Sequence, residues 1–449
     1  MRLLIIGAVA AGTSAAAKAR RNNENAEIVL YEKGSHISYA GCDTPYFIGG
    51  VIKDVKSLTP RSVDFFKKKY DVDVKIRHEV IKIDLAAKTL TVKNQDQDET
   101  FVDHYDKLIL ATGAKSVILP IPGIEQDHVF NLRNIKDALA IDSFIADKKP
   151  QSAAIIGSGS IGMELCENLK LRGLDISMIE QAHHIHPALD PDMSFHLEKQ
   201  LLSHNVKIFK NTRTAKIETD HILTSDDEKI PGDMVIAAAG VRPEVSLAVE
   251  AGIKLGETGA IAVDKYLRTS DPDVYACGDC IETFNLVTKK ASYFPLGSTA
   301  NKTGRIAGDR ATEGNLNFRG VLGTGIFKVF DLSVARTGLS ERQAREAGYD
   351  IETAHIMKPD KAAIAGGQEL IIKAIADRKT KKLLGVQILG TEGVDKRIDV
   401  LVTAMTLGAK VSDLFHLDLA YSPMHSTAKD PVMYVGMVLD NAIAASQTQ

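Results

Sequence analysis

The stretch Gly157-Ser-Gly-Ser-Ile-Gly162 constrains the fold more than any other part of the sequence. An apolar segment, residues 152–156, precedes it, and residues 163–172 follow with the apolar periodicity of a helix. A second apolar segment, residues 175–179, ends in Glu180, which lies 18 residues beyond the last glycine. A strand, a glycine turn, a helix, a strand and an acid in this order are typical of a βαβ unit that binds a dinucleotide. The sequence therefore predicts an α/β fold with a parallel sheet.

A less complete copy of this unit lies at the N-terminus. Gly7-Ala-Val-Ala-Ala-Gly12 follows a short apolar run, residues 3–6, and Glu32 ends a further apolar segment, residues 27–31. The start of the chain has features of a secretion signal, but the apolar run is only as long as one strand before a glycine interrupts it. We therefore expect a buried first strand and a helix over residues 14–20. The small number of cysteines favours a cytoplasmic protein.

Composition narrows the possible partners. The chain has 449 residues and a net charge of −3, so neither nucleic acid nor an anionic membrane is an expected partner. At about 150 residues per domain this length predicts roughly three domains. Four cysteines are too few for a disulfide scaffold, and no metal site is predicted. We expect Cys166 to lie in the core, and Cys277 and Cys280 to serve a tight turn rather than redox chemistry.

The acid of the complete unit bears on the choice of nicotinamide cofactor. Glu180 places a carboxylate where a 2′-phosphate would lie, and Gln181 rather than an arginine follows it. Like charges repel, so the sequence favours NADH over NADPH. NADPH remains open because His183 and His184 lie close by in the chain.

Two later motifs carry a resemblance to a known family. Residues 106–110 are apolar and run into Ala111-Thr-Gly113, and Thr269-Ser-Asp-Pro-Asp-Val-Tyr-Ala-Cys-Gly-Asp279 follows much later. With the two glycine units, in this order, the whole chain resembles the two-dinucleotide flavoprotein disulfide reductases. The resemblance implies two Rossmann-like domains, with an NAD(P) domain (113–241) inserted in a discontinuous FAD domain (1–112 and 242–320). It also implies a C-terminal α+β dimerisation domain (321–449), whose residues 369–375 and 383–389 alternate as strands do.

The resemblance implies FAD and a nicotinamide nucleotide as cofactors. The predicted FAD contacts come from the first glycine unit and the later motifs: Gly7, Ala8, Ala11, Gly12, Glu32, Lys33, Ala111, Thr112, Gly113, Asp279, Leu296, Gly297 and Ala300. Among these, Asp279 would hydrogen-bond the ribityl chain of the flavin. The predicted NAD contacts come from the second unit: Gly157, Gly159, Ser160, Ile161, Gly162, Glu180 and Gly240.

Cys42 places the chain within that family. Paired-cysteine members carry a second cysteine five residues on, where Phe47 stands here. The chain is therefore similar to the single-cysteine branch, which includes NADH peroxidase, NADH oxidase and coenzyme A-disulfide reductase. Peroxide and oxygen reducers usually carry a histidine at the position of Ala10. A small disulfide such as coenzyme A disulfide is therefore the favoured acceptor. Oxidase or peroxidase chemistry through a sulfenic acid, polysulfide reduction and a flavin-bound redox sensor remain alternatives.

The residues beside Cys42 give opposing expectations for its protonation. Pro45 suits the first turn of a helix, and a helix N-terminus would hold the cysteine as a thiolate. Asp43 places a carboxylate next to the thiol and would raise the thiol pKa unless it points away.

The resemblance also implies a homodimer whose active site is shared between subunits. Tyr421 would reach the partner subunit's cysteine, and His425 with Asp430 resembles the acid–base pair of paired-cysteine reductases. The predicted substrate contacts are Lys18, Arg21, Ser38, Asn301 and Arg305. Lys18, Arg20 and Arg21 form either a basic rim for coenzyme A phosphates or an ordinary solvated helix face.

Overall fold

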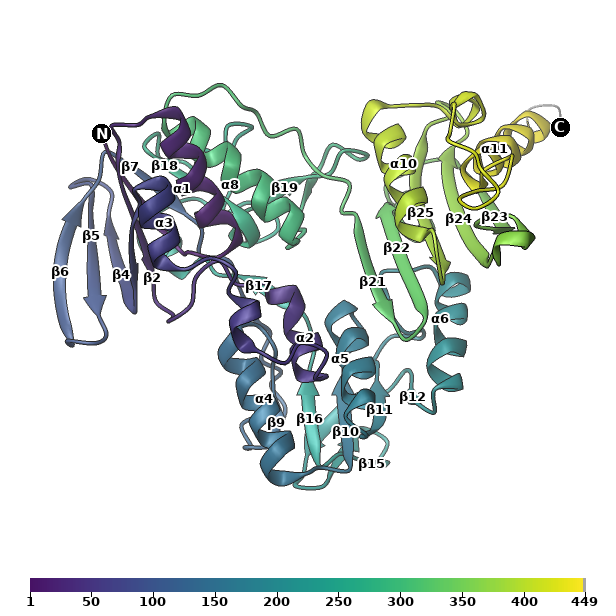
Figure 1. Cartoon of the computed structure of the whole chain (residues 1–449), viewed down its shortest axis with the longest axis horizontal. Coiled ribbons are helices and arrows are strands. Elements are labelled where there is room, and N and C mark those ends of the chain that lie inside the picture. Colours follow the sequence, from purple (N-terminus) through teal and green to yellow (C-terminus); the bar gives the residue numbers. More distant parts are fainter. Residues whose placement is uncertain (447–449) are drawn as a thin grey trace.

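A parallel sheet forms around the first glycine unit, in a computed structural model that describes residues 1–446. The strand order is β18-β7-β1-β2-β3, so β1 is central. Figure 1 shows β2, β7 and β18 of this sheet beside α1. The strands are β1 (Arg2–Ile6), β2 (Glu27–Glu32), β3 (Asp73–Ile76), β7 (Lys107–Leu110) and β18 (Val274–Ala276). Leu3, Leu4 and Ile5 have no exposed surface, as expected for the middle strand of a sheet covered on both faces.

Two helices cover this sheet and touch each other closely. α1 (Ala10–Asn22) packs against α8 (Gly297–Ala311). A Cβ atom on Gly304 would lie 2.2 Å from the carbonyl oxygen of Ala11, so only glycine permits this approach. α1 begins four residues before the predicted residue 14, because the helix starts directly at the glycine turn.

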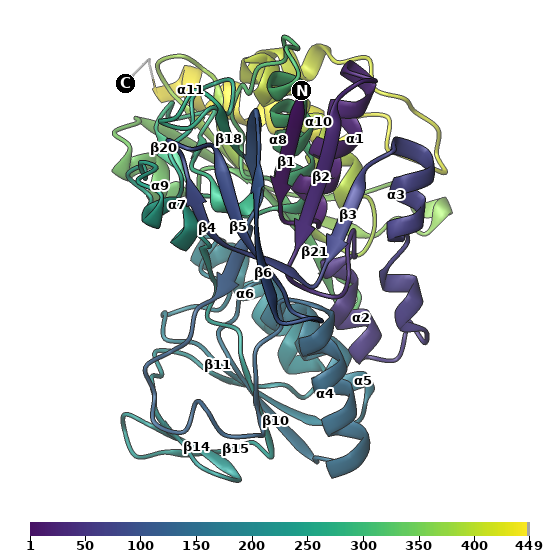
Figure 2. The ribbon, with the colours of Figure 1, turned by 90° about the vertical axis from the view of Figure 1, so that its left-hand side faces the viewer.

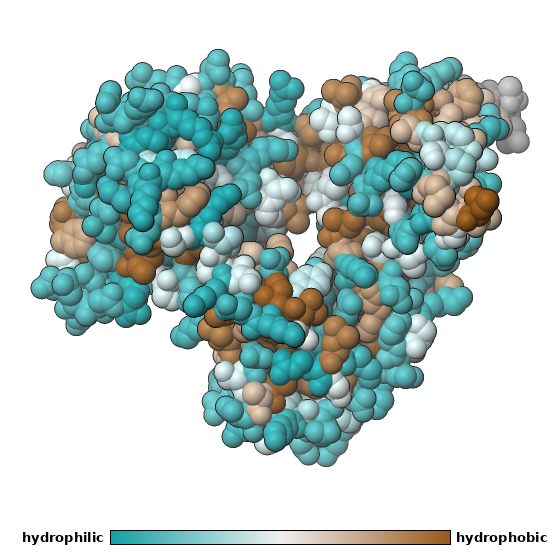
Figure 3. Space-filling model, in the orientation of Figure 1, coloured by the Kyte–Doolittle hydropathy of each residue, from teal (hydrophilic) through white to brown (hydrophobic). Residues whose placement is uncertain are grey.

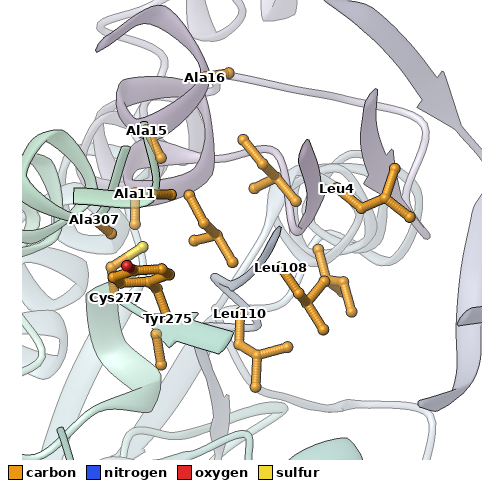
Figure 4. Close-up of a cluster of buried hydrophobic side chains, with 14 of the residues drawn as sticks. Leu4, Ala11, Ala15, Ala16, Leu108, Leu110, Tyr275, Cys277 and Ala307 are labelled. Atoms are coloured by element: carbon orange, nitrogen blue, oxygen red, sulfur yellow. The ribbon is translucent and has the colours of Figure 1, made fainter. Parts of the chain in front are cut away.

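Three of the four cysteines are core residues. Cys166, Cys277 and Cys280 have no exposed surface, which confirms the expected core position of Cys166. Figure 4 shows Cys277 beside Tyr275 within the apolar cluster under α1. The Cys280 thiol donates to the carbonyl oxygen of Cys277 at 3.2 Å, so this pair belongs to the turn it was expected to serve.

A small antiparallel sheet flanks the first sheet on its outer side (Figure 2). Its strands are β4 (His78–Asp84), β5 (Thr89–Asn94) and β6 (Glu99–His104). The helix α3 (Val63–Tyr70) precedes β3, and Ser62 caps it by accepting from the amide of Phe65. Such a cap satisfies one of the open amides at a helix start.

The second glycine unit lies in a separate parallel sheet of order β12-β11-β10-β16-β9. β10 (Ser152–Ile156) and β11 (Asp175–Ile179) have the predicted bounds. The other strands are β9 (Val129–Phe130), β12 (Lys207–Phe209) and β16 (Met234–Ala237), with helices α4 (Ile135–Lys148), α5 (Ser160–Leu171) and α6 (Pro191–Ser203). α5 begins three residues before residue 163, again directly after the glycines. A β13-β14-β15 sheet follows β12: Thr214–Ile217, His221–Thr224 and Lys229–Pro231.

Two short strands join the parallel sheets. β8 (Ala114–Ser116) pairs antiparallel with β17 (Val241–Pro243), with Ser116 opposite Val241. The chain therefore enters and leaves the second sheet at the same place. The predicted limits of the inserted domain, residues 113 and 241, lie at this ribbon. Beyond it come α7 (Ser246–Glu250) and the β19–β20 hairpin, Thr283–Phe284 and Ala291–Ser292.

One helix from the first part of the chain reaches the second sheet. The turn η1 (Gly41–Asp43) leads into α2 (Thr44–Ile48), which packs on α4 and α5 (Figure 1). Phe47 and Ile48 share an apolar cluster with Leu165 of α5 and Ile141 of α4. The segment that carries Cys42 is therefore held between the two sheets.

The C-terminal part forms a five-stranded antiparallel sheet of order β21-β22-β25-β24-β23. Its strands are β21 (Gly325–Val329), β22 (Leu332–Gly338), β23 (Ile351–Pro359), β24 (Glu369–Asp377) and β25 (Leu383–Gly390). Helices α9 (Glu341–Glu346), α10 (Val394–Leu407) and α11 (Pro431–Ser446) accompany it. β24 and β25 confirm the two strands predicted from alternation. Within residues 1–446, no helix combines the length and apolar character needed to span a membrane.

A cluster of charges around one buried lysine joins this sheet to the second one. The Lys373 ammonium on β24 lies 3.1 Å from Asp190 and 2.8 Å from each of Asp192 and Glu341. Its side chain is only 3% exposed. Asp190 precedes α6 and Glu341 begins α9, so one ammonium connects three elements.

Candidate active site

The first glycine turn has open backbone amides and a fixed acid. α1 begins at Ala10 without any side-chain cap, so amides of its first turn remain available to an anion. Glu32 at the end of β2 accepts from the amides of Ala8 at 2.9 Å and Gly34 at 2.7 Å. This set of donors and an acid fits a dinucleotide, with its pyrophosphate at the helix start and a ribose near the carboxylate.

The predicted flavin contacts converge on the same side of the first sheet. Asp279, in the turn after β18, forms an ion pair with Arg133 at 2.8 Å. The Tyr293 hydroxyl donates to the carbonyl oxygen of Asp279 at 2.9 Å. α8 starts at Gly297 after Leu296, again without a side-chain cap. The polar groups of the turn and the open helix start fit the polar chain and anionic ring system of a flavin.

Arg133 was not predicted from the sequence. Its guanidinium also donates to the carbonyl oxygen of Ala114 at 2.9 Å. Arg133 lies just before α4 and 146 residues before Asp279, so only the folded structure brings the two side chains together. No motif in the sequence surrounds it.

A cavity of about 580 Å³ lies at the carboxyl end of the second sheet. It includes the predicted contacts Gly157, Gly159, Glu180 and Gly240. Ser160 and Ile161 form the uncapped start of α5 beside Gly159. A Cβ atom on Gly162 would lie 2.3 Å from the carbonyl oxygen of Gly157, so this glycine serves the close approach of helix and strand.

Glu180 is held rigidly in this cavity. Its Oε2 accepts from the Ser158 amide at 3.1 Å and from the Ser158 hydroxyl at 2.5 Å, and its Oε1 accepts from the Ala182 amide at 2.9 Å. The residue is 7% exposed. A carboxylate has about four acceptor sites, so roughly one remains for a ribose hydroxyl. The Glu180 carboxylate can therefore accept one further hydrogen bond, from a ribose hydroxyl.

Arg213 is a second residue that sequence reasoning missed. It lines the same cavity, is exposed, and its guanidinium forms no ion pair among residues 1–446. A free guanidinium near Glu180 would attract the phosphate that the carboxylate repels. The sequence offers no signal for it, because Arg213 lies 33 residues beyond Glu180, just before β13.

Replacing Arg213 by alanine is expected to raise the KM for NADPH about tenfold, while the KM for NADH changes less than about threefold. A hydrogen bond between charged groups contributes about 1.5–3 kcal/mol, and 1.4 kcal/mol corresponds to tenfold. Steady-state kinetics with both nucleotides measure this, and Arg213→Lys should keep most of the NADPH affinity. Equal effects on both nucleotides would place Arg213 at the part of the cofactor that they share.

Cys42 lies exposed in the turn before α2, and its surroundings oppose a thiolate. Partial desolvation by the surrounding chain raises the thiol pKa, and the carboxylates of Glu164 and Asp43 raise it further. Arg133 lowers it, but to a smaller extent. The predicted thiolate is wrong because burial, and then these carboxylates, raise the pKa of the Cys42 thiol, and the helix α2 that follows has only five residues. The opposite expectation, that Asp43 raises the thiol pKa, is confirmed.

The predicted substrate residues gather between α1 and α8. The Ser14 hydroxyl donates to Asn301 Oδ1 at 2.7 Å, and Arg305 lies exposed one turn further along α8. Lys18 is ion-paired with Asp309 at 3.0 Å, so its charge is already compensated.

The other predicted substrate residues lie near the two ends of α1. The guanidinium of Arg21 lies over the Tyr70 ring, 5.6 Å from its centre, and Arg20 donates to backbone carbonyl oxygens. The amide of Ser38 donates to the carbonyl oxygen of Ala8 at 2.8 Å. Of the expected basic rim, Arg21 is the exposed member.

The C-terminal candidates lie far along the chain, in the loop before α11. Tyr421 is 57% exposed and His425 is also exposed. Asp430 is 3% exposed and bound to Arg397 at 2.9 Å and to the Ser426 hydroxyl at 2.6 Å. The predicted His425–Asp430 pair is therefore wrong, because the Asp430 carboxylate forms its ion pair with the buried Arg397 instead. The roles of Tyr421 and His425 at a second subunit stay predictions.

Two family models match the chain. The model described as pyridine nucleotide-disulphide oxidoreductase covers residues 1–293. The model of the dimerisation domain of the same family covers residues 325–431. Both models together span the two parallel sheets and the C-terminal sheet.

Relatives with known names align with nearly the whole of this chain. A coenzyme A disulfide reductase from Staphylococcus haemolyticus is 32% identical over 438 residues, 97% of this chain and 98% of the relative. An NADH oxidase from Methanocaldococcus jannaschii is 34% identical over 437 residues, 96% of this chain and 97% of the relative. The crystal structure of a reduced Bacillus anthracis protein described as CoADR-RHD superimposes with a TM-score of 0.97 at 38% identity, covering 99% of this chain and 81% of that one.

Proposed function

The chain belongs to the pyridine nucleotide-disulphide oxidoreductase family, and from this we propose that it reduces coenzyme A disulfide, or a related small disulfide or persulfide, through Cys42. It is an FAD-dependent NAD(P)H oxidoreductase that acts on a sulfur acceptor. One observation carries the choice of acceptor: among residues 1–446, Cys42 is the exposed cysteine and the other three are buried. A lone exposed sulfur has no internal partner, so its partner arrives from outside, either as the sulfur of a small molecule or as an oxygen species. The similarity to a coenzyme A disulfide reductase supports the sulfur.

The two glycine units divide the cofactors between them. The amides at the start of α1, with Glu32 and Asp279, would hold FAD, and the cavity around Glu180 would hold the nicotinamide nucleotide. FAD, when bound, supplies the two-electron relay between a nicotinamide and a cysteine. We also propose residues 1–112 with 242–320, 113–241 and 321–449 as the three domains.

Cys42 would exchange with the acceptor disulfide. Its sulfur attacks one sulfur of the acceptor, the disulfide bond breaks, and one thiolate leaves while a mixed disulfide forms on Cys42. Two electrons from NAD(P)H then release the second thiol. Because the Cys42 pKa is raised, the attacking thiolate is scarce at neutral pH, and its proton has to be moved.

A second copy of the chain would complete the site. Exposed apolar side chains, among them Ile364 at 89% and Met424 at 62%, lie on the C-terminal part that matches the dimerisation domain. Figure 3 shows hydrophobic surface at the outer edge of this part. In a homodimer, Tyr421 and His425 would meet the partner subunit's Cys42, and the exposed surface of α1 and α8 with Arg21 and Arg305 would receive the coenzyme A phosphates.

Mass spectrometry of Cys42 in the purified oxidised protein, with turnover on four acceptors, tests this proposal. We expect a coenzyme A adduct on Cys42 and the highest kcat/KM with NADH and coenzyme A disulfide. A sulfenic acid with faster turnover on oxygen or peroxide would overturn the proposal in favour of an oxidase or peroxidase. Faster turnover on polysulfide, or no turnover with any acceptor, would overturn it in favour of a polysulfide reductase or a redox sensor.

A further inference from the structure

A stripe of three residues on α5 faces the segment that carries Cys42. Glu164, Asn168 and Arg172, spaced four residues apart, lie on one side of the helix and its end. Arg172 donates to the carbonyl oxygen of Ile48 at 2.7 Å, and a Cβ atom on Gly49 would lie 2.1 Å from Asn168 Oδ1. The C-terminal ends of α2 and α5 therefore meet.

This contact indicates which face of α5 Glu164 shares. Glu164 lies one turn before Asn168 on the face of α5 that packs on α2, and Cys42 lies two residues before α2 begins. The electrostatics agree: among the charges acting on the Cys42 thiol, Glu164 has the largest effect. Asp43, next to Cys42 in the chain, in turn acts on Glu164.

Glu164 is a half-buried acid without a partner. Its carboxyl group forms no hydrogen bond and no ion pair among residues 1–446. Burial raises its pKa to about 7, and the like charges of Glu167 and Asp43 add to this rise. The titratable groups that face it are Cys42, Asp43, Tyr46 and Glu167, and none of these is a cation. An acid that titrates near neutral pH can both give and take a proton there.

We propose that the Glu164 carboxyl group is the proton donor and acceptor for sulfur at Cys42 within the same subunit. The inference rests on the proposed function, and it assigns a catalytic residue in addition to Cys42. For attack, the S–H bond of Cys42 breaks and its proton moves to the Glu164 carboxylate. For thiol release, the O–H bond of Glu164 breaks, an S–H bond forms on the departing sulfur, and the carboxylate remains. No electrons move in either transfer, and the proton balance is restored from water.

This assignment also gives Asp43 a role. Its negative charge raises the pKa of Glu164, which favours the protonated form that can give a proton to a departing thiolate. The same charge also raises the pKa of the Cys42 thiol. With Glu164 beside it to accept the proton, Cys42 can react although its thiol pKa is raised.

The pH dependence of turnover and of Cys42 alkylation tests the proposal in the reduced holoenzyme. Glu164→Gln is expected to lower kcat roughly a hundredfold and to remove the ionisation near pH 7 from the pH profile of kcat, since a positioned acid or base typically contributes 10²–10⁴-fold. The same variant should lower the pH midpoint of Cys42 alkylation by iodoacetamide, because one negative charge is removed. In Glu164→Ala, added formic or acetic acid should restore turnover in proportion to the protonated acid.

Glu167→Gln is the matched control on the same helix. Glu167 acts on Glu164, but it bonds to the backbone of Phe330, has Lys328 as its nearest opposite charge, and is not among the charges with the largest effects on the Cys42 thiol. This variant should keep the ionisation near pH 7 and shift it to lower pH, because Glu164 loses one like-charged neighbour. A Glu164→Gln enzyme that retains the ionisation and the rate, or a Glu164→Ala enzyme that no acid rescues, would overturn the proposal. The alkylation midpoint does not depend on which acceptor the enzyme uses, so it separates this failure from a failure of the proposed function.

Discussion

Replacing Cys42 by serine is expected to lower turnover with coenzyme A disulfide by at least about a thousandfold. A serine hydroxyl is not ionised at neutral pH and forms no mixed disulfide, so the exchange step loses its nucleophile. Binding of the nicotinamide nucleotide is expected to persist, because its cavity shares no residue with the turn at Cys42. Steady-state turnover, together with nucleotide binding measured by fluorescence titration, checks both parts.

Cys166→Ala is the control for this substitution. Cys166 has no exposed surface and packs in the cluster that includes Leu165 and Leu169. Removing its sulfur should cost about 1 kcal/mol of stability and leave kcat within about twofold. If the Cys42→Ser enzyme kept turnover on the disulfide, the sulfur chemistry would have to lie elsewhere on the chain.

Replacing Lys373 by methionine is expected to lower the free energy of unfolding by about 3–5 kcal/mol. The ammonium is 3% exposed and pairs with Asp190, which is 4% exposed, and with the part-exposed Asp192 and Glu341, so its removal leaves the buried Asp190 carboxylate without its cation. Lys373→Arg should retain most of the stability. Denaturant unfolding of the holoenzyme measures the difference, and Lys381→Met, which loses a half-exposed pair with Asp440, should cost less than about 1 kcal/mol.

The loss at Lys373 should also depend on pH. The Lys373 hydrogen bond lowers the pKa of Glu341 below its usual range. A carboxyl group with a depressed pKa adds stability above its unfolded pKa of about 4.3, and this is lost as the pH falls through the folded value. The deficit of Lys373→Met should therefore be largest near pH 7 and shrink below about pH 4. A deficit that does not change with pH would mean that Lys373 acts through its apolar stem instead.

Local patterns predicted the strands and glycine turns well. The apolar runs before Gly157 and before Glu180 are complete local signals, and β10 and β11 have the predicted bounds. The helices α1 and α5 began earlier than predicted, because small residues in the glycine turns carry no apolar periodicity although they already adopt helical backbone.

The parts of the site that were missed or mistaken depend on contacts between distant segments. Glu164 lies 122 residues beyond Cys42, and only the packing of α2 on α5 brings them together. Asp430 has the spacing from His425 that a catalytic acid would have, but its carboxylate forms an ion pair with Arg397 on α10. No local pattern distinguishes a carboxylate held by a distant arginine from one that is free to assist a histidine.

During synthesis, β8 leaves the ribosome long before β17, the strand that pairs with it. β7 has only β1 beside it until β18 is made at residues 274–276, so an edge of the first sheet stays open meanwhile. The second sheet has all of its strands by residue 237 and can close first. We therefore expect the order of maturation on the nascent chain to differ from the order of the sequence, with the inserted sheet native before the sheet that encloses it.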